Sequence, residues 1–279
     1  DISEMFEYDT SLKEADLSGW NVSNVLTAQE MFTGCESLQS VSLSGWQADN
    51  LQDMANMFSG CVSLTEADIS GADFPKLADA GRMFYDCKNL QTLDLSEMEF
   101  PMLHHADGMF SMDDAEMEAD GEKMALTVHL DHTRMPALNS AKELFENNTS
   151  LQEVTMNEWY APALYHADEM FRNCSALREL DFSDADLQNV HSLQASFEGC
   201  EKLIRLNLAG IRSDTIRSIA AMCCGCSSLT DYTPPGRTKE GAPDAAGHIQ
   251  EERTDWSALL IAADAFRDCK ALKNITMGA

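Results

Sequence analysis

The sequence predicts an α/β solenoid, an elongated stack of right-handed turns in which each turn adds one strand to a parallel β-sheet and one short helix to the opposite side. Two observations support this prediction. Aromatic residues recur every 26 residues along most of the chain, and each is followed by apolar residues that alternate with polar ones. A fixed period of this length is typical of repeat architectures, because one repeat cannot bury its apolar face alone.

The period is defined by an aromatic position. Phenylalanine occupies it at Phe6, Phe32, Phe58, Phe84, Phe110, Phe145, Phe171, Phe197 and Phe266. Cys223 takes this position in the repeat that precedes Phe266. Two intervals exceed 26 residues, which predicts insertions at about 111–125 and about 232–254. We therefore expect residues 1–279 to form a single solenoid domain of about nine or ten rungs.

A short helix is expected before each aromatic position. Apolar residues stand seven, four and one positions before it, as in Leu51, Met54 and Met57. These offsets lie on one face of a helix. Proline near the start of this segment, at Pro75 and at the equivalent residues of two other repeats, suits the entry to a helix.

A strand is expected after each aromatic position. A leucine follows the aromatic by six residues and opens a pattern such as Leu38-Val41-Leu43, in which apolar and polar residues alternate as in a strand. One strand per repeat gives a parallel sheet with strands about 4.8 Å apart. Helices are about 10 Å wide, so the helix side should splay, making it convex and the sheet concave.

Two kinds of sequence block resemble a known family. The block Met57-Phe58-Ser59-Gly60-Cys61-Val62-Ser63-Leu64 and the stretch Leu17-Ser18-Gly19-Trp20-Asn21-Val22-Ser23-Asn24-Val25 look like the BspA-like leucine-rich repeats of bacterial surface proteins, which also occur in mycoplasma surface lipoproteins. The resemblance covers nearly the whole chain. It implies a leucine-rich-repeat fold, an extracellular or cell-surface location, and a role in adhesion or protein recognition. The two insertions and Cys223 depart from the pattern.

The charge of the chain restricts its partners. It carries 47 acidic and 19 basic residues and a formal net charge of −28. Nucleic acid and anionic membranes are excluded as partners, because both are bound by clustered lysine and arginine. The sequence contains no apolar run of the roughly 20 residues that would span a bilayer, and its first residues do not resemble a signal peptide. It ends in mid-repeat, so we expect a piece of a longer protein or end-to-end pairing.

Nine cysteines raise the question of disulfides or a metal. Seven of them follow the aromatic position by three residues, which predicts a structural file of free, buried thiols. Neighbouring rungs are close enough for disulfides, so spacing alone does not exclude bridges. Cys223, Cys224 and Cys226 form a local cluster, but a zinc site needs a second pair that the sequence lacks.

No catalytic signature appears, so neither an enzyme nor a cofactor is predicted. Two weak metal signals exist. His129, Asp131 and His132 are close along one expected strand, and residues 113–122 are acidic and faintly resemble a calcium loop that lacks its final glutamate. A solvated surface accounts for both, and no metal site is assigned.

The expected binding surface is the acidic, concave face of the sheet together with the second insertion. The sheet candidates are Glu14, Asp16, Glu66, Asp68, Asp94, His129, Asp131, Glu153, Glu179, Asp181 and Arg205. The loop candidates are Tyr232, Arg237 and Lys239. The predicted partner is a protein, such as a host or matrix protein, or else a glycan. The alternative is a structural stalk whose acidic residues only decorate a solvated face. The oligomeric state stays open.

Overall fold

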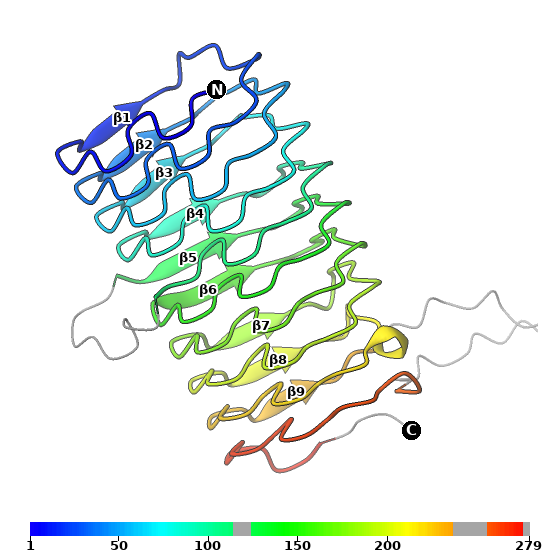
Figure 1. Ribbon diagram of the computed structural model, residues 1–279. Helices are drawn as coiled ribbons and strands as arrows, with labels where there is room; N and C mark the ends of the chain where they lie inside the picture. The colour runs from blue at the N-terminus through cyan, green and yellow to red at the C-terminus, as the bar shows by residue number, and fades with distance from the viewer. Residues whose placement is uncertain (114–123, 237–255, 276–279) are drawn as a thin grey trace, which may run out of the picture.

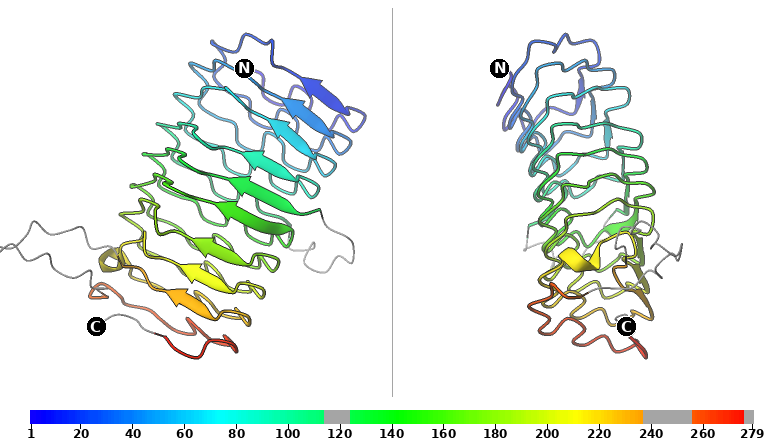
Figure 2. Two further views of the ribbon diagram at one scale, coloured as in Figure 1. Left: turned by 180° about the vertical axis from the view of Figure 1, so that it is seen from behind. Right: turned by 90° about the vertical axis from the view of Figure 1, so that its right-hand side faces the viewer.

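The computed structural model describes residues 1–113, 124–236 and 256–275 as one parallel β-solenoid (Figures 1 and 2). Each turn contributes one short strand. The strands are β1 (Glu14–Asp16), β2 (Ser40–Ser42), β3 (Glu66–Asp68), β4 (Thr92–Asp94), β5 (Leu126–His129), β6 (Leu151–Thr155), β7 (Glu179–Asp181), β8 (Arg205–Asn207) and β9 (Asp231–Thr233). Eight turns of the chain thus separate β1 from β9, which agrees with the expected repeat and parallel sheet.

The strands pair in sequence order and in register. Glu14 pairs with Ser40 and Ser40 with Glu66, so partners are one repeat apart. β1 to β6 form one sheet and β7 to β9 another. The break between them falls where Phe182, directly after β7, replaces the smaller aliphatic residues found at this position in other turns.

Two further files of isolated parallel bridges join the turns away from the strands. One runs from Thr27 through Asp53 and onward to Ile261, and the other includes the pairs of Gln47 with Asp73 and of Arg134 with Tyr160. Most turns are therefore hydrogen-bonded to the next at three places around their circumference. Figures 1 and 2 show a nearly straight stack.

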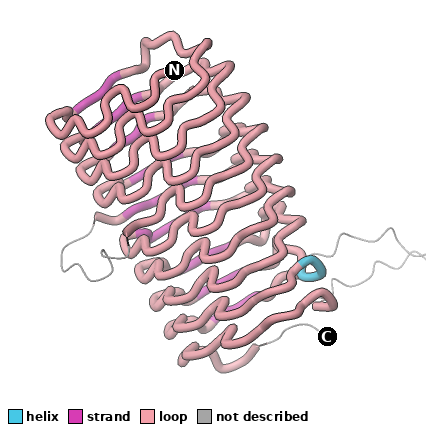
Figure 3. Tube along the Cα trace, viewed as in Figure 1, coloured by secondary structure: helices cyan, strands magenta, loops and turns pink. Residues whose placement is uncertain are grey.

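The expected convex helices are absent from the described residues, and that part of the prediction was wrong. The helical element there is η2 (Ser213–Thr215), a single 3-10 turn, and Figure 3 shows the remainder of each turn as loop. The N–H groups of Ala28, Glu30 and Phe32 donate to carbonyl oxygens of the following turn instead of to their own segment. Without wide helices on one side, the physical reason for a concave sheet also disappears.

These segments are chains of tight turns. Residues bonded to the next turn of the solenoid alternate with residues that close local β-turns. The N–H groups of Met31 and Thr33 donate to the carbonyl oxygens of the residues three positions earlier. Glu30 adopts a φ of 56° and Gly34 a φ of 70°, both left-handed. A right-handed α-helix cannot continue through either residue, because a positive φ turns the backbone out of the helical path.

The core consists of files of equivalent side chains. Eight phenylalanines, from Phe6 to Phe197, form seven stacked pairs with ring centroids 5.1–5.9 Å apart. The file ends at Cys223. Beside it, Tyr232 of β9 occupies a position held by Leu206 in β8, and its ring contacts Phe266 edge-on at 5.1 Å. The larger side chain of Tyr232 therefore lies next to the position where Cys223 replaces the aromatic residue.

Candidate recognition surface

The solvent face of the sheet carries two files of side chains from two strand positions that lie two residues apart. The glutamate file comprises Glu14, Glu66, Glu153 and Glu179, and all four are exposed. The aspartate file comprises Asp16, Asp68, Asp94 and Asp181. Because the strands are parallel and in register, equivalent residues of neighbouring turns lie about 4.8 Å apart.

The aspartate file closes the turn that follows each strand. Asp16 Oδ1 accepts the N–H of Ser18 at 3.1 Å, and the three other aspartates accept the N–H two residues ahead at 2.8–3.0 Å. Hydrogen bonds from the side chain and backbone of Ser18 lower the pKa of Asp16. Ser70 acts likewise on the pKa of Asp68. These carboxylates therefore have a structural role, which makes them weaker candidates for binding than the glutamates.

Asp131 also holds neighbouring turns together. It accepts the hydroxyl of Thr155 at 2.6 Å and the backbone N–H of Asn157 at 2.8 Å. Burial raises its pKa, but these hydrogen bonds and the nearby His129 outweigh burial and lower it. His129 Nδ1 lies 3.1 Å from the Thr155 hydroxyl. The structure thus brings His129 and Asp131 together around Thr155.

The glutamate file is free of such internal bonds over most of its length. At its C-terminal end, Arg205 lies 3.3 Å from Glu179 and 3.7 Å from Asp231, which offsets part of the negative charge of this stretch. Among the described residues, Glu14, Glu66 and Glu153 have no cationic partner. The sequence alone could not separate these three from the aspartates, because both files are acidic and alternate with apolar residues.

The residues predicted to bind from the second insertion are Tyr232, Arg237 and Lys239. Tyr232 lies in β9 instead of in a loop, and its buried hydroxyl finds no hydrogen-bond partner among the described residues. Burial and the neighbouring Cys223 raise its pKa well above the ordinary value. Its assignment as a loop contact was therefore wrong, because the strand extends further than the turn signals indicated. Arg237, Lys239 and the core of the acidic insertion, residues 114–123, lie outside the described residues.

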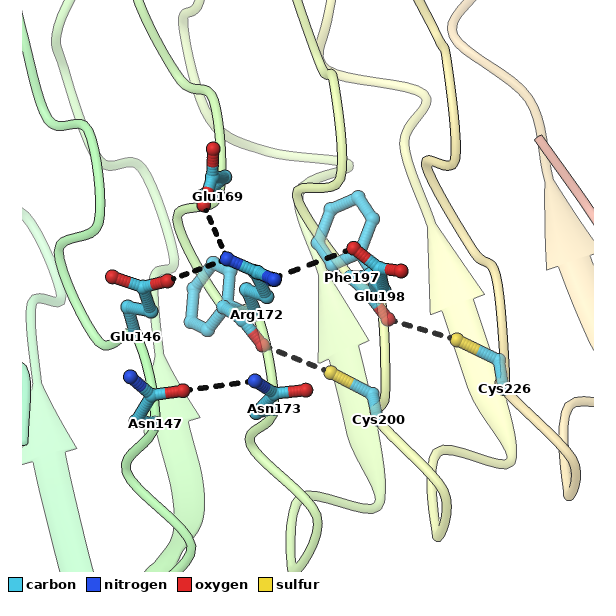
Figure 4. Close-up of polar contacts among 10 residues, drawn as sticks. Glu146, Asn147, Glu169, Arg172, Asn173, Phe197, Glu198, Cys200 and Cys226 are labelled. Carbon is cyan, nitrogen blue, oxygen red and sulfur yellow. Dashed lines mark hydrogen bonds and ion pairs between the residues drawn. The ribbon is translucent and has the colours of Figure 1, made fainter. Parts of the chain in front are cut away.

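A cluster that sequence analysis missed lies on the turn segments (Figure 4). Arg172 Nη1 contacts Glu169 at 2.8 Å and Glu146 at 3.0 Å, and its Nε lies 3.4 Å from Glu198. Burial, followed by the charges of Glu143 and Glu169, raises the pKa of Glu146 to about 7. One guanidinium thus bridges three successive turns. Spacing could have revealed it, since Glu146, Arg172 and Glu198 are 26 residues apart.

The cysteine file consists of free thiols, as expected. Each of its thiols donates to a backbone carbonyl of the preceding turn. Figure 4 shows two of them, Cys200 bonded to Phe171 O and Cys226 bonded to Phe197 O, both at 3.0 Å. Burial raises the pKa of the Cys200 thiol well above its ordinary value, so it stays protonated as a donor. No group of three potential metal ligands is found among the described residues.

An interior cavity among the described residues is too small and too apolar to be an alternative site for a ligand. An enclosed cavity between successive turns has a volume of about 20 Å³ and is lined by apolar side chains such as Met54, Ile69 and Met135. It has no polar group to orient a substrate. No helix in the described residues is long and apolar enough to cross a membrane.

A family comparison identifies the repeat. Residues 1–124 and 116–233 match the family described as "Mycoplasma protein of unknown function, DUF285". The chain belongs to this family. The resemblance to repeats of mycoplasma proteins is thereby confirmed. The more specific BspA-like assignment stays an expectation. No curated protein is significantly similar to the DUF285 chain.

Solved structures of leucine-rich-repeat proteins show distant likeness to the DUF285 chain. A leucine-rich-repeat protein of Leptospira interrogans is 14% identical over 80% of this chain and 60% of its own, with a TM-score of 0.29. An internalin of Listeria monocytogenes is 12% identical over 89% and 65%, also with a TM-score of 0.29. A leucine-rich cell surface protein of Faecalibacterium prausnitzii is 14% identical over 83% and 62%, with a TM-score of 0.26. The chain spans under two thirds of each, and TM-scores this low do not establish function.

Proposed function

We propose that this chain is a surface-exposed recognition module that binds a basic region of a protein partner through the glutamate file. The observation that carries this proposal is the contrast between the two acidic files. The aspartates are hydrogen-bonded into turns, whereas Glu14, Glu66 and Glu153 point carboxylates into solvent without a counter-charge among the described residues.

Electrostatics favours a basic partner. Carboxylates spaced along one face of a low-dielectric sheet add their fields, and a net charge of −28 extends that field around the molecule. Such a surface accelerates encounter with a cationic protein and repels acidic ones. The sheet itself is rigid, because every strand is held in register by its neighbours. Arg237 and Lys239 are proposed as additional contacts, and the cell surface is the proposed location.

A matched pair of variants tests the proposal. The triple variant E14Q, E66Q and E153Q removes three charges from the glutamate file. The control, E36Q, D49N and E201Q, removes three exposed charges from the edges of the turns and gives the same net charge. Wild-type protein immobilised at physiological salt is used to capture and identify partners from host-surface and matrix extracts. The affinity of each variant for the purified partner is then measured by calorimetry.

We expect the glutamate variant to bind the purified partner about tenfold or more weakly than wild type, and the control to differ by less than about threefold. Equal affinities of both variants would contradict the proposal. A chain that captures no partner with saturable affinity would instead be a structural stalk, the second candidate function. The stalk is favoured by the near identity of successive turns, and it predicts that neither variant changes any measured interaction.

A further inference from the structure

Four of the seven histidines of the chain gather on one surface away from the strands. His105 and His166 belong to the file of bridges that runs from Thr27 to Ile261, and both bridge to Ser140, which lies between them. His104, Tyr165, His191 and Arg217 each directly precede a residue of that bridge file. We call His104, His105, Tyr165, His166, His191 and Arg217 the histidine strip.

The rings of the strip are ordered by contacts with one another. Tyr165 stacks on His191 with ring centroids 4.0 Å apart and meets His166 edge-on at 4.6 Å. The Nδ1 atoms of His104 and His191 lie 3.1 Å and 2.6 Å from the carbonyl oxygens of Ala137 and Asn189. A carbonyl oxygen only accepts, so Nδ1 carries the proton in each ring and Nε2 is the nitrogen left to gain one.

The fixed charges around the strip are slightly negative while its histidines are neutral. Lys142 and Arg217 supply two positive charges, against the carboxylates Asp79, Asp107 and Asp168. Asp79 and Asp107 are occupied by backbone N–H groups, and Asp168 lies 4.0 Å from His166.

Glu143, directly after Lys142, adds one carboxylate beside the strip, whereas two other carboxylates there are paired. Glu169 is bound to Arg172, and Asp214 of η2 is bound to Arg212. Protonation of the four imidazoles therefore makes the strip cationic.

The molecule carries a complementary surface of its own. Glu14 and Glu66 of the glutamate file lie two turns apart, and the turns that carry His104 and His166 of the histidine strip are also two apart, so two solenoids side by side can match two pairs of charges at once. In Figures 1 and 2, η2, which ends two residues before Arg217, lies on the side of the stack away from the strands. Among the described residues, the two surfaces therefore do not overlap. At physiological salt, charges are screened over about 8 Å, so the local match outweighs the repulsion between distant acidic groups.

We propose that, in mildly acidic solution, the histidine strip docks onto the glutamate file of a second copy of this chain. The proposal rests on the glutamate file being the open recognition surface identified above. The contact is heterologous, because it joins two different surfaces. It therefore leaves one free strip and one free file at the ends, and it propagates into chains of molecules instead of stopping at a dimer.

Sedimentation velocity tests this directly. Wild-type protein is compared at about pH 7.5 and about pH 5.5, which stays above the sequence pI of about 4.3. We expect monomers at the higher pH and a concentration-dependent series of oligomers at the lower pH, dispersed again by about 0.5 M salt. Monomers at both values would overturn the proposal.

Two surface variants sharpen the test. The strip variant H104Q, H166Q and H191Q and the glutamate variant E14Q, E66Q and E153Q should each remain monomeric near pH 5.5. Mixed together they should form discrete heterodimers, because each retains one functional surface. The control E36Q, D49N and E201Q should still oligomerise. A strip variant that oligomerises like wild type, or a mixture that stays monomeric, would overturn the proposal.

The same variants separate this inference from the proposed function. The strip variant should bind the protein partner normally at about pH 7.5, since the glutamate file is intact. Self-association without a protein partner would leave this inference standing while the proposed function failed. A partner bound through the glutamate file without self-association would show the reverse.

Discussion

Hydrogen-bond donors at one position of the repeat show how single residues specify the stack. In seven turns a cysteine thiol donates to a carbonyl oxygen of the preceding turn, as Cys61 does to Phe32 O at 3.2 Å. Where the cysteine is replaced by Asn148, the side-chain amide donates to Phe110 O at 3.0 Å. Cysteine and asparagine differ chemically, but both carry a hydrogen-bond donor at a similar distance from the backbone. The position therefore favours a residue that donates this hydrogen bond, and the cysteines there do so as free thiols.

Replacing Cys61 by alanine should destabilise the fold by about 1–3 kcal/mol, because the carbonyl of Phe32 loses its buried donor. Serine at the same position keeps a donor and should recover part of this loss. Urea unfolding of the two variants measures the difference. Identical free energies of unfolding for the alanine and serine variants would show that the thiol serves only to fill space.

Glu146 should make stability depend on pH near neutrality. Its pKa is raised to about 7 in the fold, mainly by burial, from an ordinary value of 4.5. The folded state then binds a proton that the unfolded state releases, so the stabilisation from that proton is complete below about pH 4.5 and is lost as the pH rises through about 7. Wild type should therefore lose stability relative to E146Q between about pH 5 and pH 8, by about 1–3 kcal/mol.

Unfolding curves of both proteins across this range test the prediction, and the comparison cancels the contribution of other acidic groups. The glutamine that replaces Glu146 can still accept a hydrogen bond from Arg172, so the variant should fold normally. A constant difference between the two proteins at every pH would mean that Glu146 is already ionised in the fold.

At the scale of the element, left-handed residues convert a helical pattern into a chain of turns. The position two residues after the aromatic is left-handed in most turns and is filled by glycine in some of them and by Asn147 or Asn173 in others. Asparagine and glycine are the residues that adopt this conformation at least cost. Gly60 is the clearest case, with a φ of 72° and only Gly34 near the place of an added Cβ, at an ordinary contact distance of 3.7 Å.

Gly60→Ala should therefore cost about 1–2 kcal/mol through backbone conformation alone. Gly60→Asn should cost clearly less, because asparagine tolerates the left-handed region. Thermal or urea unfolding measures both. An alanine variant as stable as the asparagine variant would contradict the assigned backbone conformation.

The same position explains what sequence analysis could and could not foresee. The 26-residue period and the alternation around Val41 predicted the parallel sheet and its register, because both depend on which residues are buried. The helix was predicted wrongly because apolar offsets of seven, four and one describe a buried face and do not specify where backbone N–H groups donate. Glu30, an ordinary helix former, gives no sign that its φ is 56°.

The sequence predicted which face of the sheet carries the candidate recognition surface, but not which of its carboxylates are free. Sequence placed Glu66 and Asp68 together on the solvent face, and the structure confirms this placement. That Asp68 is held by Ser70 while Glu66 is free follows from backbone geometry two residues away. The Arg172 cluster joins three turns through side chains, and it was overlooked because no single repeat contains it.

For the whole molecule, the consequence of losing the helices is a straight stack. When each turn is bonded to the next on several sides, the advance per turn is the strand spacing of about 4.8 Å everywhere around the circumference. A helix-backed repeat would instead advance by about 10 Å per turn on its convex side. Straightness bears on the two proposed interactions, because it keeps the glutamate file and the histidine strip at the same repeat distance along the molecule.

Distances between spin labels on opposite sides of the stack test this central claim most directly. Cysteines introduced at Glu14 and Glu179 span six turns along the sheet, and cysteines at Asn24 and Asn189 span six turns on the far side. Unmodified protein measures background labelling of the native thiols, eight of which are buried. Pulsed electron resonance should give about 29 Å for both pairs. A far-side distance approaching about 60 Å, twice that along the sheet, would contradict the straight β-solenoid.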